Sequence, residues 1–308
     1  MDAKSLFEWR DVLFEYVGFL SSFAMLGAIG FRYGVVRSSA EGAAHLPRAN
    51  AFRAASARAG LIGLLGAVLG VIAIVESLSK RADAKHTTFT QAFTLGGVTV
   101  AAQALLLAVL LVLFLLAWRR IAVAWPIAGV AALAFALRNV LGGTLKGMVN
   151  PLHVLGASLW LGTLFVLVVC GIGEMLRPSV PVADRESAVS EMVHRFSILA
   201  LCSAGLLGLT GLITAWTHLN PFAALWTTPY GYVLIAKLCV VAVVAGLGAW
   251  NWRRVGPALG HEGGALKIRR SASTELAFAA VVLALTGVLV SVPSPKKPSV
   301  HQSEPASK

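Results

Sequence analysis

The sequence predicts an all-α fold, a polytopic membrane bundle of about eight transmembrane helices. Of the 308 residues, 57% are hydrophobic and only 13% are charged, whereas soluble proteins carry about 25% charged residues. The mean hydropathy is +0.77. About 20 consecutive apolar residues cross a bilayer as a helix, and the apolar residues here gather in runs of that order. We therefore predict an integral membrane protein.

Eight apolar runs account for the predicted helices. In chain order they cover residues 12–36, 54–74, 93–118, 121–137, 150–176, 196–216, 230–252 and 277–292. The fourth run is short and contains Pro126. Only Arg119 and Arg120 separate it from the third run, so these two helices are expected to form a tight antiparallel hairpin.

The chain divides into three predicted parts. Residues 1–149 form an N-terminal four-helix membrane half, residues 150–292 a second four-helix half, and residues 293–308 a disordered periplasmic tail. The tail is polar and rich in proline, a composition that cannot bury a core. The N-terminal residues lack a cleavable signal pattern, so we expect the first span to be retained.

Basic residues are distributed unevenly between the two sets of loops. Fifteen lysines and arginines fall on one predicted side and ten on the other, and Lys237 lies within a span. Because cytoplasmic loops carry the excess of lysine and arginine, both termini are expected to be periplasmic. The net charge of +12 is then explained by contact with anionic lipid, and we expect no nucleic-acid partner.

The fifth span carries a candidate site. On a helix, His153, Gly156 and Trp160 form one stripe, with the imidazole near the outer membrane edge and the indole as a floor beneath it. Ser158 and Gly162 form a second, narrow face that favours close packing of another helix. An alternative is that His153 caps the helix and Trp160 belongs to the interfacial aromatic belt.

A second histidine is predicted on the same side of the membrane. His218 ends the sixth span, and helices adjacent in sequence usually pack side by side, so His153 and His218 are expected to meet. Met148 lies five residues before His153. Imidazoles with a thioether suit soft or borderline metals, copper especially. The alternative is that both histidines have capping and interfacial roles.

Lys237 is a charge within the seventh span, and such groups usually face a cavity or a carboxylate. Glu76 or Glu15 is a candidate partner; the alternative is that the lysine stem extends to the membrane surface. The three cysteines, Cys170, Cys202 and Cys239, lie in apolar runs. They are more typical of packing than of a metal relay.

The sixth span contains two pairs of small residues that predict close helix packing, namely Ala204 with Gly208 and Gly211 with Ala215. The sequence has no Walker loop, nucleophile elbow or HExxH pattern. We therefore expect no enzymatic activity.

Three segments of the second half carry a set of linked motifs. They read HVLGASLWLGTLFVLV, HRFSILALCSAGLLGLTGLITAW and YGYVLIAKLCVVAVVAGLGAWNWRRV. The motif residues are His153, Trp160 and Gly162; Arg195, Phe196 and Ser197; Thr210, Gly211 and Leu212; Lys237; and Asn251 with Arg253. In these residues the chain resembles the CopD family of bacterial inner-membrane copper resistance proteins.

The resemblance implies a multi-pass inner-membrane protein that moves copper ions between periplasm and cytoplasm, in the inward direction. A periplasmic copper-binding protein is an expected partner besides the lipid bilayer. His153, His218 and Met148 are the expected copper ligands, and Trp160, Lys237, Glu76 and Arg195 the expected path or structural residues. Two alternatives remain: a b-type haem protein with paired histidine ligands, and a non-transporting membrane assembly subunit.

Overall fold

The structure, a computed structural model, describes residues 9–36, 46–138, 140, 145–218, 223–250, 253 and 263–291. Every element within these residues is a helix, η denoting a π-helical turn. The elements are α1 (Trp9–Gly30), η1 (Phe31–Val35), α3 (Leu46–Ala84), α4 (Phe89–Leu95), α5 (Gly97–Trp118), α6 (Ala124–Leu137), α7 (Leu145–Ala157), η2 (Ser158–Gly162), α8 (Thr163–Val166), η3 (Leu167–Ile172), α9 (Gly173–Met175), α10 (Val182–His218), α11 (Ala224–Thr227), α12 (Pro229–Trp250) and α13 (Gly264–Ser291).

The predicted all-α polytopic bundle is confirmed. Among the described residues, seven helices are long and apolar enough to cross a membrane, and α6 is a shorter apolar helix. These eight helices correspond to the eight predicted spans. Residues 119–123 connect α5 to α6, and the two helices pack against each other, with Phe114 and Trp125 in an edge-to-face contact at 6.4 Å between ring centroids.

Three helices begin about two turns or more before the predicted start. α3 begins at Leu46 rather than at residue 54, α10 at Val182 rather than 196, and α13 at Gly264 rather than 277. Hydropathy detects only the part of a helix that crosses hydrocarbon. The added turns are polar, and cross-helix contacts stabilise them beyond the membrane.

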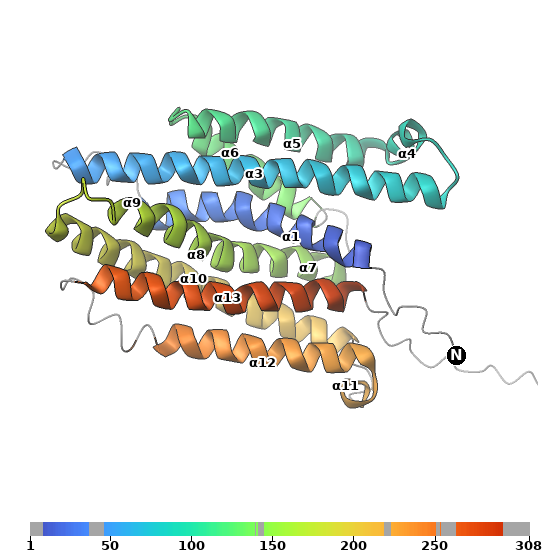
Figure 1. The fold of residues 1–308 in the computed structure, drawn as a ribbon. Coiled ribbons are helices and arrows are strands. Elements are labelled where there is room, and N and C mark those ends of the chain that lie inside the picture. Colours follow the sequence, from blue (N-terminus) through green and yellow to red (C-terminus); the bar gives the residue numbers. More distant parts are fainter. Residues whose placement is uncertain are drawn as a thin grey trace, which may run out of the picture.

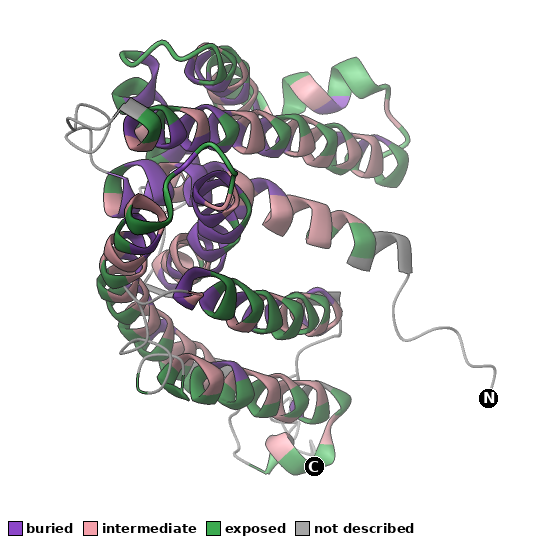
Figure 2. Cartoon of the chain, turned by 60° about the vertical axis from the view of Figure 1, so that its left-hand side comes forward, coloured by how far each residue is buried: buried purple, intermediate pink, exposed green. Residues whose placement is uncertain are grey.

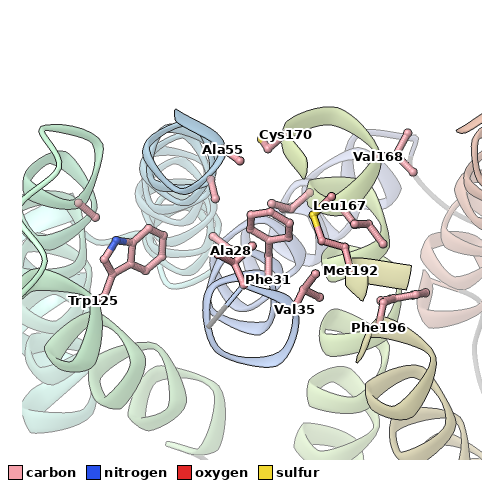
Figure 3. Packing of buried hydrophobic residues seen from close by; sticks show 14 of the residues in the cluster. Ala28, Phe31, Val35, Ala55, Trp125, Leu167, Val168, Cys170, Met192 and Phe196 are labelled. Carbon is pink, nitrogen blue, oxygen red and sulfur yellow. The ribbon is translucent and has the colours of Figure 1, made fainter. Parts of the chain in front are cut away.

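The helix α1 lies inside the bundle (Figure 1), packed against α3 on one side and against η2, α8 and α13 on the other. α5 lies beyond α3, and α6 packs against α5 and also against α1 and α7. α12 lies at the opposite edge, packed on α13. The principal core joins Phe31 of η1 to Ala55 of α3, Leu167 of η3 and Met192 of α10 (Figure 3). Helices from both predicted membrane halves therefore contribute to one core, and the boundary at residue 150 stays a prediction.

Burial is greatest in the span that follows the α6–α7 connection. In the span of residues 147–175, 67% of the most apolar 18-residue stretch is buried. In every other span found in the described residues this share is 39% or less. Figure 2 shows the buried residues gathered in the interior of the bundle, with exposed residues on the outward faces. Those outward faces carry large apolar side chains such as Val98, Leu201 and Leu212, as contact with lipid requires.

A contact between two glycines fixes how closely α1 approaches this span. A Cβ atom on Gly27 would collide with the main chain of Gly162, and one on Gly162 would collide with the carbonyl of Phe23. Ser158 is fully buried. At Gly162 the predicted narrow face therefore packs closely on α1.

Ion pairs join the helices at one end of the bundle, called here the basic end. The carboxylate of Glu174 is buried and pairs with Arg58 of α3 and with Arg177. The Glu186 carboxylate accepts a 2.9 Å hydrogen bond from the main-chain N–H of Ala265, in the first turn of α13, where a negative charge is favourable.

Candidate functional site

The candidate site lies where α7 packs against α10. The sequence predicts that this helix begins at Asn150-Pro151, but α7 begins at Leu145 and Pro151 lies inside it. Proline cannot donate the hydrogen bond to the carbonyl four residues earlier, so the carbonyl of Gly147 lacks that partner. His153 is consequently in the third turn of α7 and is half-buried.

His153 is held by a hydroxyl of α10. The distance between His153 Nδ1 and Thr210 Oγ1 is 2.9 Å. Thr210 Oγ1 also lies 2.7 Å from the carbonyl oxygen of Leu206, to which it donates its single hydrogen. The hydroxyl therefore accepts from His153, and we assign the proton of the neutral ring to Nδ1. The lone pair is then on Nε2, the arrangement found in metal-binding histidines whose other nitrogen donates to a fixed acceptor.

Small residues make room for the ring between the two helices. A Cβ atom on Gly211 would lie 3.5 Å from His153 Cε1, and one on Gly156 would lie 3.3 Å from the carbonyl oxygen of Ser203. Gly208, by contrast, has nothing within 4 Å of a Cβ atom. The predicted close packing at Gly208 is thus wrong, because that position of α10 faces away from α7.

Trp160 is placed apart from His153 and Gly156. It packs against a cluster that includes Phe23 of α1 and Ala279 of α13, whereas His153 and Gly156 contact α10. The π-helical turn η2, which includes Trp160, has more residues per turn than an α-helix and shifts the expected stripe. The role of Trp160 as a floor beneath the imidazole stays a prediction.

Met148 lies five residues before His153, and its role as a copper ligand stays a prediction. Both residues lie in the same helix, and five residues rotate an α-helix by about 140° beyond a full turn. The two side chains therefore leave the helix on different faces.

His218 is the last residue of α10, and its side chain lies outside the described residues. Its main-chain position is seven residues beyond Gly211, two turns further along the same face and about 10 Å nearer the end of the helix. Among the residues that the structure describes, no group of three or more His, Cys, Asp or Glu side chains is arranged to hold a metal. The predicted pairing of His153 with His218 stays a prediction.

Lys237 lies on α12 and is close enough to act electrostatically on His153. Its proposed partner Glu76 lies on α3, at the other side of the bundle from α12 (Figure 1), and the structure does not bring the two together. The cysteines Cys170, Cys202 and Cys239 are free thiols on three different elements, η3, α10 and α12.

Arg195 belongs to the basic end and not to the candidate site. Its guanidinium lies 2.5 Å from one carboxylate oxygen of Glu191, and the other oxygen of Glu191 lies 2.7 Å from Arg48 of α3. This arrangement gives Arg195 a role in joining α10 to α3.

Sequence reasoning missed two features. Thr210 appears only as part of a family motif, although a threonine within a span that carries small residues indicates a hydrogen bond to a neighbouring helix. The second feature is a polar cleft that includes Ser21 and Arg138. No sequence motif predicts it, since its residues come from separate helices.

These features define a multi-pass helical membrane protein with one oriented imidazole between two packed helices. Residues 190–289 match the family model described as Copper resistance protein D. The chain is also 29% identical over 158 residues to the Copper transport protein CutJ of Bacillus subtilis (strain 168). That alignment covers 49% of this chain and 26% of the relative. These matches confirm the predicted resemblance to the CopD family. No solved structure matches.

Proposed function

We propose that this protein moves copper ions inward across the bacterial inner membrane, and that His153 and His218 are the ligands that receive the ion on the periplasmic side. The observation that carries the proposal is the hydrogen bond between His153 Nδ1 and Thr210 Oγ1, which leaves Nε2 free as a donor to copper. The similarity to a copper transport protein and to the copper resistance family supports the choice of metal.

The antiparallel arrangement of α7 and α10 supports a shared site. The Cα–Cβ bonds of a helix tilt toward its own N-terminus, so the bond at position 153 tilts toward the end of the pair where α10 ends at His218. A metal bound by two imidazoles needs each nitrogen about 2 Å away. The separation of about two helical turns along α10 must be bridged by this tilt.

The distribution of charge supports an inward direction of entry. Four arginines gather at the basic end, namely Arg48, Arg58, Arg177 and Arg195. The positive-inside rule assigns this end to the cytoplasm. His153 lies toward the opposite end, where α7 begins and α10 ends (Figure 1). Under this orientation both termini and the site are periplasmic.

Lys237 has an electrostatic role in the proposed path. A positive charge near the ligands weakens the binding of a cation, and a transport site must release its ion as well as capture it.

The proposed partner is a periplasmic copper-binding protein, which would deliver the ion to this site.

Copper uptake into proteoliposomes tests the transport proposal. Vesicles of phosphatidylethanolamine and phosphatidylglycerol are loaded with a fluorescent copper chelator, and uptake is compared for the wild type, His153→Ala and protein-free vesicles. We expect wild-type uptake to exceed that of both controls. Equal uptake in all three would contradict transport, and a Soret band in the purified protein would favour the haem alternative.

A further inference from the structure

A second polar region lies away from the α7–α10 pair. It is a cleft of about 570 Å³ between α1, α3 and α5, closed at one side by the end of α6. Hydroxyl, amide and guanidinium groups line it, contributed by Ser21, Ser22, Ser77, Gln103, Arg81 and Arg138. Polar and charged side chains within membrane-spanning helices are costly and usually mark a function.

The cleft has an open mouth and a closed inner end. Arg81, Ser77 and Thr99 at the mouth are exposed. Phe135 and Ser21 at the inner end are buried, with Ser21 only 2% exposed. A molecule of limited size can therefore enter from one side and reach buried polar groups.

Two buried donors at the inner end have no hydrogen-bond partner. They are Ser21 Oγ and Arg138 Nε. The hydroxyl points toward Gly70, which also lines the cleft: a Cβ atom on Gly70 would lie 2.8 Å from Ser21 Oγ. Leaving such a group unpaired costs about 1–3 kcal/mol, so both donors favour a ligand that accepts hydrogen bonds.

The guanidinium of Arg138 is fixed in position beside the cleft. It donates to the carbonyl oxygen of Phe135, and its carbon lies 4.2 Å from the centroid of the Phe135 ring. An aromatic face favours a cation in this position. The side chain is thus held in place before any ligand binds.

The charge of the lining selects an anion. Arg81 and Arg138 both line the cleft, and none of its described lining residues is acidic. Guanidinium groups match the oxygens of phosphate in geometry as well as in charge. Serine hydroxyls and the Gln103 amide supply further donors.

We propose that this cleft binds a phosphate group, carried either by a phospholipid headgroup or by inorganic phosphate. Arg138 and Ser21 hold the phosphate at the inner end, and Arg81 attracts it at the mouth. The bound group contacts Ser21 of α1 and Arg138 at the end of α6 and so joins these two helices. This inference does not depend on copper or on His153.

The test uses the full chain in nanodiscs of zwitterionic phosphatidylcholine. Binding of inorganic phosphate is measured by calorimetry, and retention of phosphatidylglycerol by native mass spectrometry after extraction from membranes. The variants are Arg138→Gln and, because a buried substitution can impair folding, Arg81→Gln at the exposed mouth. Arg269→Gln removes the same charge from an exposed position on α13 and serves as the matched control.

We expect one of the two phosphate sources to bind to the wild type and to Arg269→Gln. Arg138→Gln should bind about tenfold more weakly, the effect of losing one charge-assisted hydrogen bond, and Arg81→Gln should show a smaller loss because its charge acts from the mouth. Calorimetric binding identifies free phosphate as the ligand, and lipid retention alone identifies a headgroup. Absence of both, or equal binding by Arg81→Gln, Arg138→Gln and the control, would overturn the proposal.

Discussion

His153 of α7 and Thr210 of α10 are joined by a 2.9 Å contact between Nδ1 and Oγ1. The threonine hydroxyl gives its hydrogen to its own helix, so the histidine must donate. One hydrogen bond thereby fixes both the tautomer and the orientation of the ring. The proposed copper site depends on this relationship.

Replacing Thr210 with valine removes the acceptor while keeping the side-chain shape. We expect Thr210→Val to weaken copper binding by about tenfold, since losing the partner of a metal-binding histidine usually costs at least that much. Thr210→Ser should keep wild-type affinity. The control is Thr214→Val, one turn further along α10, whose hydroxyl bonds to the carbonyl of Thr210; a loss of the same size there would point to a general effect on α10. Competition with a copper chelator measures the copper affinity of all three variants.

Removing the charge of Lys237 is expected to strengthen copper binding, the opposite of the effect of Thr210→Val. A positive charge at Lys237 opposes a cation bound at His153, so Lys237→Met should strengthen copper binding severalfold. Lys237→Arg keeps the charge and should bind copper as the wild type does. Weaker binding by Lys237→Met would show that the lysine assists the site in another way. The same chelator competition measures the copper affinity of both Lys237 variants.

The contact of α1 with the most buried span provides a test of the fold. Gly162→Ala forces a methyl group against the main chain of α1, and overpacking of this kind costs about 1–3 kcal/mol. The midpoint of thermal unfolding in detergent should fall. Gly208→Ala introduces the same methyl group where nothing lies within 4 Å, and the midpoint should stay unchanged or rise.

Two carboxylates of the basic end differ in burial. Glu174 is 2% exposed and Glu191 is 37% exposed, and each pairs with two arginines. Glu174→Gln should lower the unfolding midpoint more than Glu191→Gln, because charge interactions are weaker where water screens them. A larger loss for Glu191→Gln would mean that its link from α10 to α3 dominates.

The sequence predicts the fold well because the bilayer constrains it. Long apolar runs must be helices, since lipid offers no partner for main-chain polar groups. The starts of α3 and α10 are missed because their first turns are polar and are stabilised by contacts such as Arg48 with Glu191. Those contacts depend on how the helices pack, which hydropathy does not record.

The candidate site is only partly predicted. The sequence identifies His153 and places its helix beside α10, since neighbouring helices in sequence pack together. It does not place Met148, because a proline within α7 and the earlier helix start put this residue on another face. Nor does it place Trp160, because the π-helical turn η2 interrupts the α-helical spacing.

Copper affinity and stoichiometry in the purified protein test the central claim most directly. The measurement compares the wild type with His153→Ala, His218→Ala and Met148→Leu by chelator competition. The account predicts one copper ion in the wild type, about a hundredfold weaker binding in each histidine variant, and wild-type binding in Met148→Leu. Unchanged affinity and stoichiometry in both histidine variants would contradict it.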